Sequence, residues 1–258
     1  DFSQAITRAG WDTNALAIKG EFPEYEQIWR ESGVTAGNRQ LIGAGVTSAR
    51  GTSEGLYDAA LLLSMEFESF NWMIKATKAD DIRKAKKEGK FAGFITTQDT
   101  LEFGTNLGLL EKFYDFGLRV VQLTYSPQNL VGSGCSESDN GGLSNLGVGF
   151  VKKMNELGML IDTGHCNKQT ILDACKVSSA PVITSHTAVK SVYNHTRAKD
   201  DETLSAVAGT GGVIGVVVVP EFIGRGNNVT IEHFLDHVDY LVKLVGIEHV
   251  GIGTDWPM

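Results

Sequence analysis

The sequence predicts an α/β fold, a (β/α)8 barrel of the TIM type, and three observations support this prediction. Short apolar segments alternate with longer segments of helical periodicity along the chain of 258 residues. Eight short segments have the composition of strands, which suits a barrel of about 250 residues. A doubly wound sheet is the alternative, but no GxGxxG motif follows any strand segment. We therefore expect a single barrel domain over residues 1–258.

The strand segments are short runs rich in β-branched residues. Continuous apolar runs of this length are typical of parallel strands that are buried on both faces. The clear runs are residues 91–97, 118–125, 159–165, 180–186, 211–219 and 249–255. Two weaker candidates, residues 12–18 and 33–41, precede them.

Longer segments between the strands carry the periodicity of amphipathic helices. They are residues 56–76, 79–88, 147–157, 167–176 and 231–245. Gly89 follows the second helix directly, where a glycine commonly ends a helix. No helix follows Asp255 to cover the last strand, so we expect the sequence to be a fragment of a slightly longer chain.

The composition excludes several classes of protein. The net charge of -8 argues against nucleic acid or an anionic membrane surface as a partner. No apolar run reaches the length of a membrane span, which predicts a soluble protein. Three cysteines are too few, and odd in number, for a disulfide framework. No signal peptide is visible, but the sequence begins at Asp1, so the compartment stays open between the cytoplasm and the periplasm.

Polar side chains stand at the ends of several predicted strands. His165 and His186 end two of them, Asp255 ends the last, and Tyr125 and Gln98 end or follow two others. Since the carboxyl ends of barrel strands form the working face, these side chains are expected to meet at one rim. Imidazole and carboxylate are zinc ligands, and a catalytic zinc keeps one position open for water. The pattern indicates a metal site, whereas one histidine alone at a strand end is more often a capping or core residue.

Three further residues have two readings each. Cys166 could be a soft metal ligand, but a buried core residue is the more frequent case. Asp162 is either a structural carboxylate or an acceptor that holds a metal ligand in place. Arg197 could bind a carboxylate through a bidentate fork, or lie in a solvated loop before a helix N-cap at Asp200 or Asp201.

Four segments together resemble the membrane (renal) dipeptidase family of zinc hydrolases. They are GMLIDTGH at residues 158–165, PVITSH at 181–186, NHTRAKDDE at 194–202 and HVGIGTD at 249–255. The resemblance extends from about Asp80 to Asp255, and the order and spacing of the segments make it specific. Residues 123–147 also resemble a bacterial subgroup of these dipeptidases.

The resemblance implies a barrel of the metal-dependent hydrolase kind, with a binuclear zinc site and a bridging hydroxide that cleaves dipeptides. It implies that His165 and His186 bind one zinc, and that Asp255 handles the proton of the attacking water. It further implies that Arg197 holds the substrate carboxylate and that the chain pairs as a homodimer.

The sequence departs from the family pattern at four positions. Asn14 and Leu16 stand where the first strand should offer a histidine and an aspartate as metal ligands. Gln98 replaces the glutamate that bridges both metals, and Tyr125 replaces a histidine. Leucine cannot bind zinc, and a neutral amide is a poor bridging ligand. Half of the binuclear site is therefore expected to be missing.

The remaining residues predict one zinc, with two as the alternative. His165 and His186 would hold it, joined by Asp255 or Gln98. One zinc can lower the pKa of bound water to about 7. Asp255 could then act as the general base, and the hydroxyl of Tyr125 could stabilise the oxyanion.

Three functions compete. The leading one is a zinc-dependent, dipeptidase-like hydrolase acting on a dipeptide or a similar small substrate. The second keeps the chemistry but uses another small amide, such as an N-acyl amino acid. The third is a non-catalytic barrel that has lost part of the metal site. Metal content separates the third from the others, and a substrate panel separates the first two.

Overall fold

A parallel sheet forms the centre of the computed structural model, which describes residues 24–40, 67, 69–138, 141–226 and 228–255. All pairings between its named strands are parallel. The strands follow the order β1 (Ala36–Gln40), β3 (Phe91–Thr97), β4 (Leu118–Gln122), β5 (Leu160–Asp162), β6 (Val182–Val189), β8 (Ile214–Val216) and β9 (Val250–Ile252). Off this path, β2 (Met73–Lys75) pairs with β3 and β7 (Ala198–Lys199) pairs with β6.

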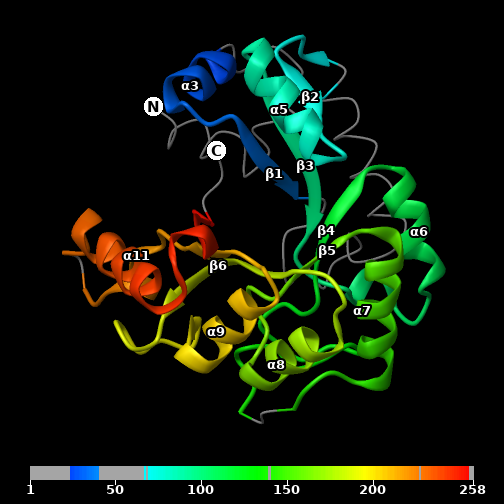
Figure 1. Ribbon diagram of the computed structural model, residues 1–258, viewed down its shortest axis with the longest axis vertical. Helices are drawn as coiled ribbons and strands as arrows, with labels where there is room; N and C mark the ends of the chain where they lie inside the picture. The colour runs from blue at the N-terminus through cyan, green and yellow to red at the C-terminus, as the bar shows by residue number, and fades with distance from the viewer. Residues whose placement is uncertain (1–23, 41–66, 68, 139–140, 227, 256–258) are drawn as a thin grey trace.

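The sheet is curled into a half-barrel, with helices along its outer side (Figure 1). The helices are α3 (Tyr25–Ser32), α5 (Ala79–Glu88), α6 (Gly108–Asp115), α7 (Asn145–Leu157), α8 (Lys168–Val177), α9 (Asp201–Gly209), α10 (Pro220–Ile223) and α11 (Ile231–Val245), with 3-10 turns η2 (Leu101–Phe103) and η3 (Ile247–His249). The predicted α/β architecture is confirmed. The segment predicted as the first strand, residues 12–18, lies outside the described residues.

Side-chain caps fix where three of the helices begin. Ser144, Asn167 and Asp200 each accept a hydrogen bond from the backbone amide three residues later, at 2.9–3.0 Å. Such a cap stabilises a helix by about 1 kcal/mol. The predicted N-cap at Asp200 is confirmed, and it starts α9. Helices α5 and α11 have the predicted bounds, and Gly89 ends α5 in the left-handed conformation with φ of 64°.

The prediction of a helix over residues 56–76 is wrong at its end. Residues 73–75 form β2, which pairs with β3 at Phe91–Gly93. Trp72 and Met73 are buried in the core, so packing and strand pairing outweigh the local helical periodicity there. Residues 56–66 lie outside the described part of the chain.

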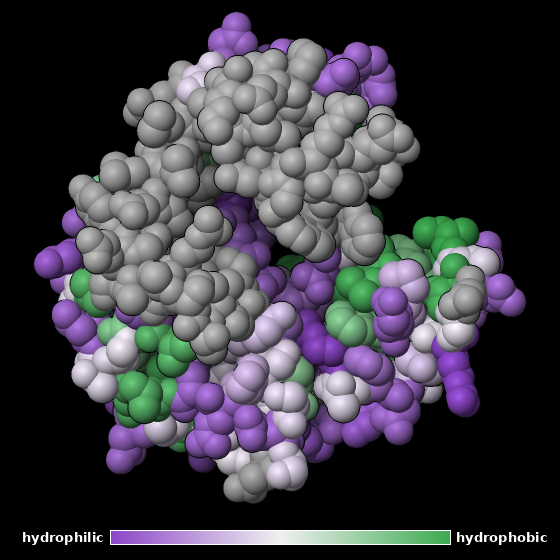
Figure 2. All heavy atoms as spheres, turned by 180° about the vertical axis from the view of Figure 1, so that it is seen from behind, coloured by the Kyte–Doolittle hydropathy of each residue, from purple (hydrophilic) through white to green (hydrophobic). Residues whose placement is uncertain are grey.

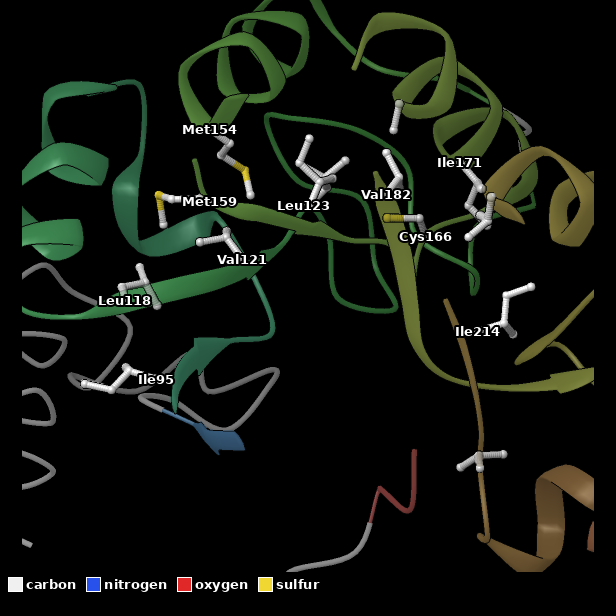
Figure 3. Close-up of a cluster of buried hydrophobic side chains, with 14 of the residues drawn as sticks. Ile95, Leu118, Val121, Leu123, Met154, Met159, Cys166, Ile171, Val182 and Ile214 are labelled. Carbon is white, nitrogen blue, oxygen red and sulfur yellow. The ribbon is translucent and has the colours of Figure 1, made fainter. Parts of the chain in front are cut away.

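One large hydrophobic cluster joins the strands to the helices outside them (Figure 3). Its fully buried members include Ile95 of β3, Val121 of β4, Met154 of α7 and Ile171 of α8. Cys166 belongs to the same cluster, and burial raises the pKa of its thiol to about 12. This favours the reading of Cys166 as a core residue. The close packing holds the strand ends rigidly, and the candidate site lies at those ends.

Some apolar side chains remain on the surface. Ile231 and Leu235 of α11 are 63% and 43% exposed, and Figure 2 shows hydrophobic surface on the side where α11 lies. In the described part of the chain, no helix has the length and apolar character needed to cross a membrane. The single domain over residues 1–258 stays a prediction.

Candidate functional site

Most of the predicted site residues lie in loops just beyond the strands. Tyr125, His165 and Asp255 each follow the end of a strand by three residues, after β4, β5 and β9. His186 differs, because β6 continues past it to Val189. The expectation that strands end at these four residues is therefore wrong in detail. All of them still lie toward the carboxyl ends of the strands, where barrel enzymes carry their catalytic groups.

The structure brings the predicted residues into one group. The rings of His165 and His186 lie 4.9 Å apart between centroids, and the Tyr125 ring stacks on His165 at 4.1 Å. His186 Nε2 lies 3.8 Å from Asp255 Oδ1. Asp255 also forms a hydrogen bond with the Gln98 side chain.

A chain of hydrogen bonds orients the His186 ring. The Ser185 hydroxyl donates to Asp162 Oδ2 at 2.5 Å, so it accepts from His186 Nδ1 at 2.8 Å. Asp162 Oδ1 accepts from two backbone amides, those of Gly164 and Ser185. These donors favour the ionised carboxylate, against the burial that raises its pKa. Asp162 is thus the acceptor that holds a candidate ligand, as one of its readings proposed.

His186 Nε2 is consequently the unprotonated ring nitrogen and carries a lone pair. The residue is 4% exposed, and this atom has no hydrogen-bond partner within the described ranges. Burial, followed by the charges of Arg197 and Lys199, lowers the pKa of His186 to about 3. The ring is therefore neutral at physiological pH and offers Nε2 as an acceptor or a ligand.

A different serine, Ser126, orients the His165 ring. Its Nδ1 lies 2.8 Å from the Ser126 hydroxyl, in the residue directly after Tyr125. Burial and then the Arg197 charge hold the pKa of His165 below its usual range. With Nδ1 engaged by Ser126, Nε2 is the nitrogen that remains for a ligand.

Arg197 is buried, so its reading as part of a solvated loop is wrong. The residue is 5% exposed, and its Nη1 donates to the carbonyl oxygen of Gly164 at 2.6 Å. Nε and Nη2, which share one edge of the guanidinium group, are buried without a hydrogen-bond partner among the described residues. The Phe222 ring packs against the guanidinium, 5.5 Å from Cζ to the ring centroid. One edge of a fixed guanidinium group is thus unpartnered among the described residues, which suits the binding of an anion.

Asp255 and Tyr125 complete the group. Burial raises the pKa of Asp255, while Arg197 and the hydrogen bond from Gln98 oppose this shift. The Asp255 backbone has φ of 54°, a conformation that non-glycine residues adopt rarely and that is often found at functional sites. Burial also raises the pKa of Tyr125, so its hydroxyl keeps its proton.

The donor types suit a metal, but the described residues do not form a complete ligand set. Nowhere in the ranges described above do three or more His, Cys, Asp or Glu side chains gather closely enough to hold a metal ion. The buried, unpartnered Nε2 of His186 is the atom that fits a ligand role. The family positions Asn14 and Leu16 lie outside the described residues.

Sequence reasoning missed several residues that hold the group together. Ser126 and Ser185 orient the two imidazoles, and Lys199 donates to the carbonyl oxygen of Cys166 at 2.5 Å. Gln122 donates from Nε2 to the carbonyl oxygen of Gln98 at 2.7 Å. The two serines stand beside predicted site residues in the sequence, but no spacing distinguishes them from other serines.

Comparisons with known proteins show the family and the fold of this chain. Residues 46–257 match the profile of the membrane dipeptidase family (Peptidase family M19). An uncharacterized dipeptidase of Schizosaccharomyces pombe is 33% identical over 185 residues, which cover 69% of this chain and 44% of that protein. The chain thus spans less than half the length of this curated relative.

Solved structures share the fold. An amidohydrolase from Pseudomonas aeruginosa aligns with a TM-score of 0.83 at 30% identity, over 92% of this chain and 71% of its own. A metallopeptidase from Rhodobacter sphaeroides, bound to a phosphinate mimic of the dipeptide L-Ala-D-Ala, aligns with a TM-score of 0.79. It is 22% identical, over 89% of this chain and 76% of its own.

Proposed function

Because this chain belongs to the membrane dipeptidase family, we propose that it is a zinc-dependent, dipeptidase-like hydrolase that cleaves the amide bond of a dipeptide or similar small substrate. The observation that carries the proposal is the unpartnered edge of Arg197, near His165, His186 and Asp255. This arrangement offers an anchor for a carboxylate next to groups suited to hydrolysis.

Arg197 supplies the anchor. A carboxylate accepts two parallel hydrogen bonds from one edge of a guanidinium group, which fixes its orientation as well as its position. The Nη1 bond to Gly164 and the packing against Phe222 hold the fork before a substrate arrives. We infer that this edge of Arg197 binds the C-terminal carboxylate of a dipeptide.

We assign the metal to His165 and His186, and proton transfer to Asp255 beside them. A bound zinc lowers the pKa of water to about 7 and polarises a carbonyl group. Asp255 Oδ1 receives the proton of the attacking water, because a carboxylate with a raised pKa is a better base near neutral pH. The protonated hydroxyl of Tyr125 donates to the oxygen on which negative charge develops.

A dipeptide and its C-terminal amide test the anchor directly. The unmodified protein is expected to hydrolyse the dipeptide with a kcat/KM at least about a hundredfold higher than that of the amide, because the fork needs an anion. Arg197→Met should remove most of this difference, whereas the exposed Arg225→Met should preserve it. An Arg197→Met variant that keeps the preference for the free carboxylate would remove Arg197 from substrate binding.

A small amide other than a dipeptide is the second candidate substrate. The relative from Pseudomonas aeruginosa with a TM-score of 0.83 is an amidohydrolase, and Tyr125 and Gln98 depart from the dipeptidase pattern. An N-acetyl amino acid carries the same carboxylate as a dipeptide but no free amine. Turnover of N-acetyl amino acids without turnover of dipeptides would favour this alternative.

We also propose that the protein forms a homodimer. The family resemblance implies a homodimer, and light scattering of the purified protein measures this directly. A mass equal to a single chain at micromolar concentration would exclude the dimer.

A further inference from the structure

The backbone around His165 is held by three donors that come from outside its loop. The carbonyl oxygen of Gly164 accepts from Arg197 Nη1 at 2.6 Å, and that of Cys166 accepts from Lys199 Nζ at 2.5 Å. The carbonyl oxygen of His165 itself accepts from the backbone amide of Cys135 at 2.8 Å. The three successive carbonyl groups at this position are therefore all fixed.

Two of these donors are cations from the same short segment. Arg197 and Lys199 lie two residues apart around β7, so their side chains leave the same face of the extended backbone. β7 is anchored to β6, where Val189 pairs with Lys199. The two cations thus bind the carbonyl groups on either side of His165 from a support that belongs to the sheet.

The burial of Lys199 needs an explanation. It is 5% exposed, and its ammonium group forms no ion pair with a carboxylate in the described part of the chain. Burying a cation without an ion pair is costly, and a methionine of similar shape would avoid this cost. Burial lowers the pKa of Lys199 to about 8, so the group is still mostly protonated at neutral pH.

The hydrogen bonds within the loop, from the Gly164 amide to Asp162 and from the Cys166 amide to the carbonyl oxygen of Thr163, leave the carbonyl groups of residues 164–166 to donors from elsewhere. Gly164 precedes His165, and glycine is the residue with the greatest backbone freedom. A side chain at Gly164 is excluded, because its Cβ would lie 2.7 Å from Gln122 Oε1 and 2.9 Å from His186 Cε1. The site therefore needs a residue without a side chain next to His165, and donors from elsewhere add restraint to this glycine.

We propose that Lys199 is a positioning residue for His165, and that with Arg197 it forms a clamp on the peptide carbonyls flanking this histidine. The inference rests on the proposed function, in which His165 holds the reactive group. The clamp fixes the backbone, while Ser126 and the Tyr125 ring fix the imidazole. Nη1 of Arg197 thereby belongs to the clamp, whereas the edge formed by Nε and Nη2 remains for the substrate.

The chain offers a matched control for this role. Lys190 lines the same small cavity as Lys199, of about 150 Å³, but it is exposed at the surface. Replacing either lysine by methionine removes one positive charge from this cavity. Only Lys199→Met removes a hydrogen bond to the His165 loop.

The test combines kinetics with NMR of the histidine side chains. Two-bond ¹H–¹⁵N spectra resolve the ring nitrogens of the six histidines, and the loss of peaks in His165→Gln assigns that residue. Lys199→Met should shift the ring signals of His165 and lower kcat by at least about tenfold, with KM changed less than about threefold. Lys190→Met should change neither.

Two results would overturn the clamp. One is a folded Lys199→Met protein whose His165 signals stay at their original positions. The other is a Lys199→Met protein whose kcat stays within about threefold of the unmodified protein. If this variant does not fold, Lys199→Arg decides, because it keeps both the charge and a donor. An unchanged His165 spectrum and a kcat within about threefold of the unmodified protein in Lys199→Arg support the clamp. A tenfold loss of kcat in Lys199→Arg while the His165 signals stay in place contradicts it.

The NMR comparison also separates the clamp from the function on which it rests. A protein that hydrolyses no dipeptide and no other small amide would contradict the proposed function. The positions of the His165 signals in Lys199→Met and Lys190→Met would still decide whether Lys199 positions His165.

Discussion

His186 Nε2 lies 3.8 Å from Asp255 Oδ1, and within the described residues it has no hydrogen-bond partner. Its Nδ1 is committed to Ser185, so Nε2 presents a lone pair to the carboxylate. A nitrogen lone pair and a carboxylate oxygen repel each other unless a cation or a hydrogen-bond donor lies between them. This relationship supports a metal at His186, with the Asp255 carboxylate beside it.

Ser185→Ala should weaken the site without removing a proposed ligand. The substitution breaks the link from Asp162 to His186 Nδ1, so the ring loses the acceptor that fixes its tautomer. Loss of such an outer hydrogen bond typically costs 10- to 100-fold in metal affinity or activity, and we expect a zinc affinity about tenfold lower. Competition with a chromophoric chelator measures it. Ser191→Ala, an exposed control, should bind zinc like the unmodified protein; equal affinity in Ser185→Ala would argue against the link.

Gly164→Ala should destabilise the protein. The new Cβ would lie within 3 Å of both Gln122 Oε1 and His186 Cε1, so one of these buried side chains must move. Overpacking of this kind costs about 1–3 kcal/mol, which urea unfolding measures. The control is Gly209→Ala in α9, where nothing lies within 4 Å of the new Cβ and the change should be neutral or stabilising. Equal stability of the two variants would contradict the close packing around Gly164.

The lowered pKa of Asp200 should make the free energy of unfolding depend on pH. Although burial opposes the shift, hydrogen bonds from Lys168 and Thr203 hold the pKa of Asp200 below its ordinary value. A depressed pKa in the folded state means that the stabilisation is complete above the unfolded pKa of about 3.9 and is lost as pH falls through the folded value. Asp200→Asn keeps an oxygen for the helix cap but loses the charge.

The measurement is urea unfolding of both proteins between pH 6 and pH 3. Asp200→Asn should be less stable than the unmodified protein at pH 6, and the difference should shrink as the pH falls below about 4. Asp200→Ala should lose about a further 1 kcal/mol at every pH, because it also removes the cap of α9. A difference between the Asp200→Asn and unmodified proteins that stays constant with pH would contradict this assignment.

The fold could be predicted where local signals are strong. Apolar runs and helix caps place β3, α5 and α11 at their predicted bounds, because periodicity and capping act within a few residues. β2 could not be predicted in this way. Its three residues are extended because they pair with β3, and this long-range contact leaves no local pattern.

The site was predictable in its principal residues but not in their supports. Strand ends point to His165, His186 and Asp255, because the topology of parallel strands brings their carboxyl ends together. The roles of Ser185 and Lys199 depend on contacts with residues 23 and 33 positions away, at Asp162 and Cys166. Such contacts follow from the folded structure and not from spacing along the chain.

Metal content tests the central claim most directly. The purified protein, offered zinc and dialysed against metal-free buffer, should retain about one zinc per chain by elemental mass spectrometry. His186→Ala should lose it, whereas His233→Ala, at a partly exposed histidine of α11, should keep it. No retained zinc in the folded, unmodified protein, or a His186→Ala variant that still holds its full complement, would contradict a metal site at His165 and His186.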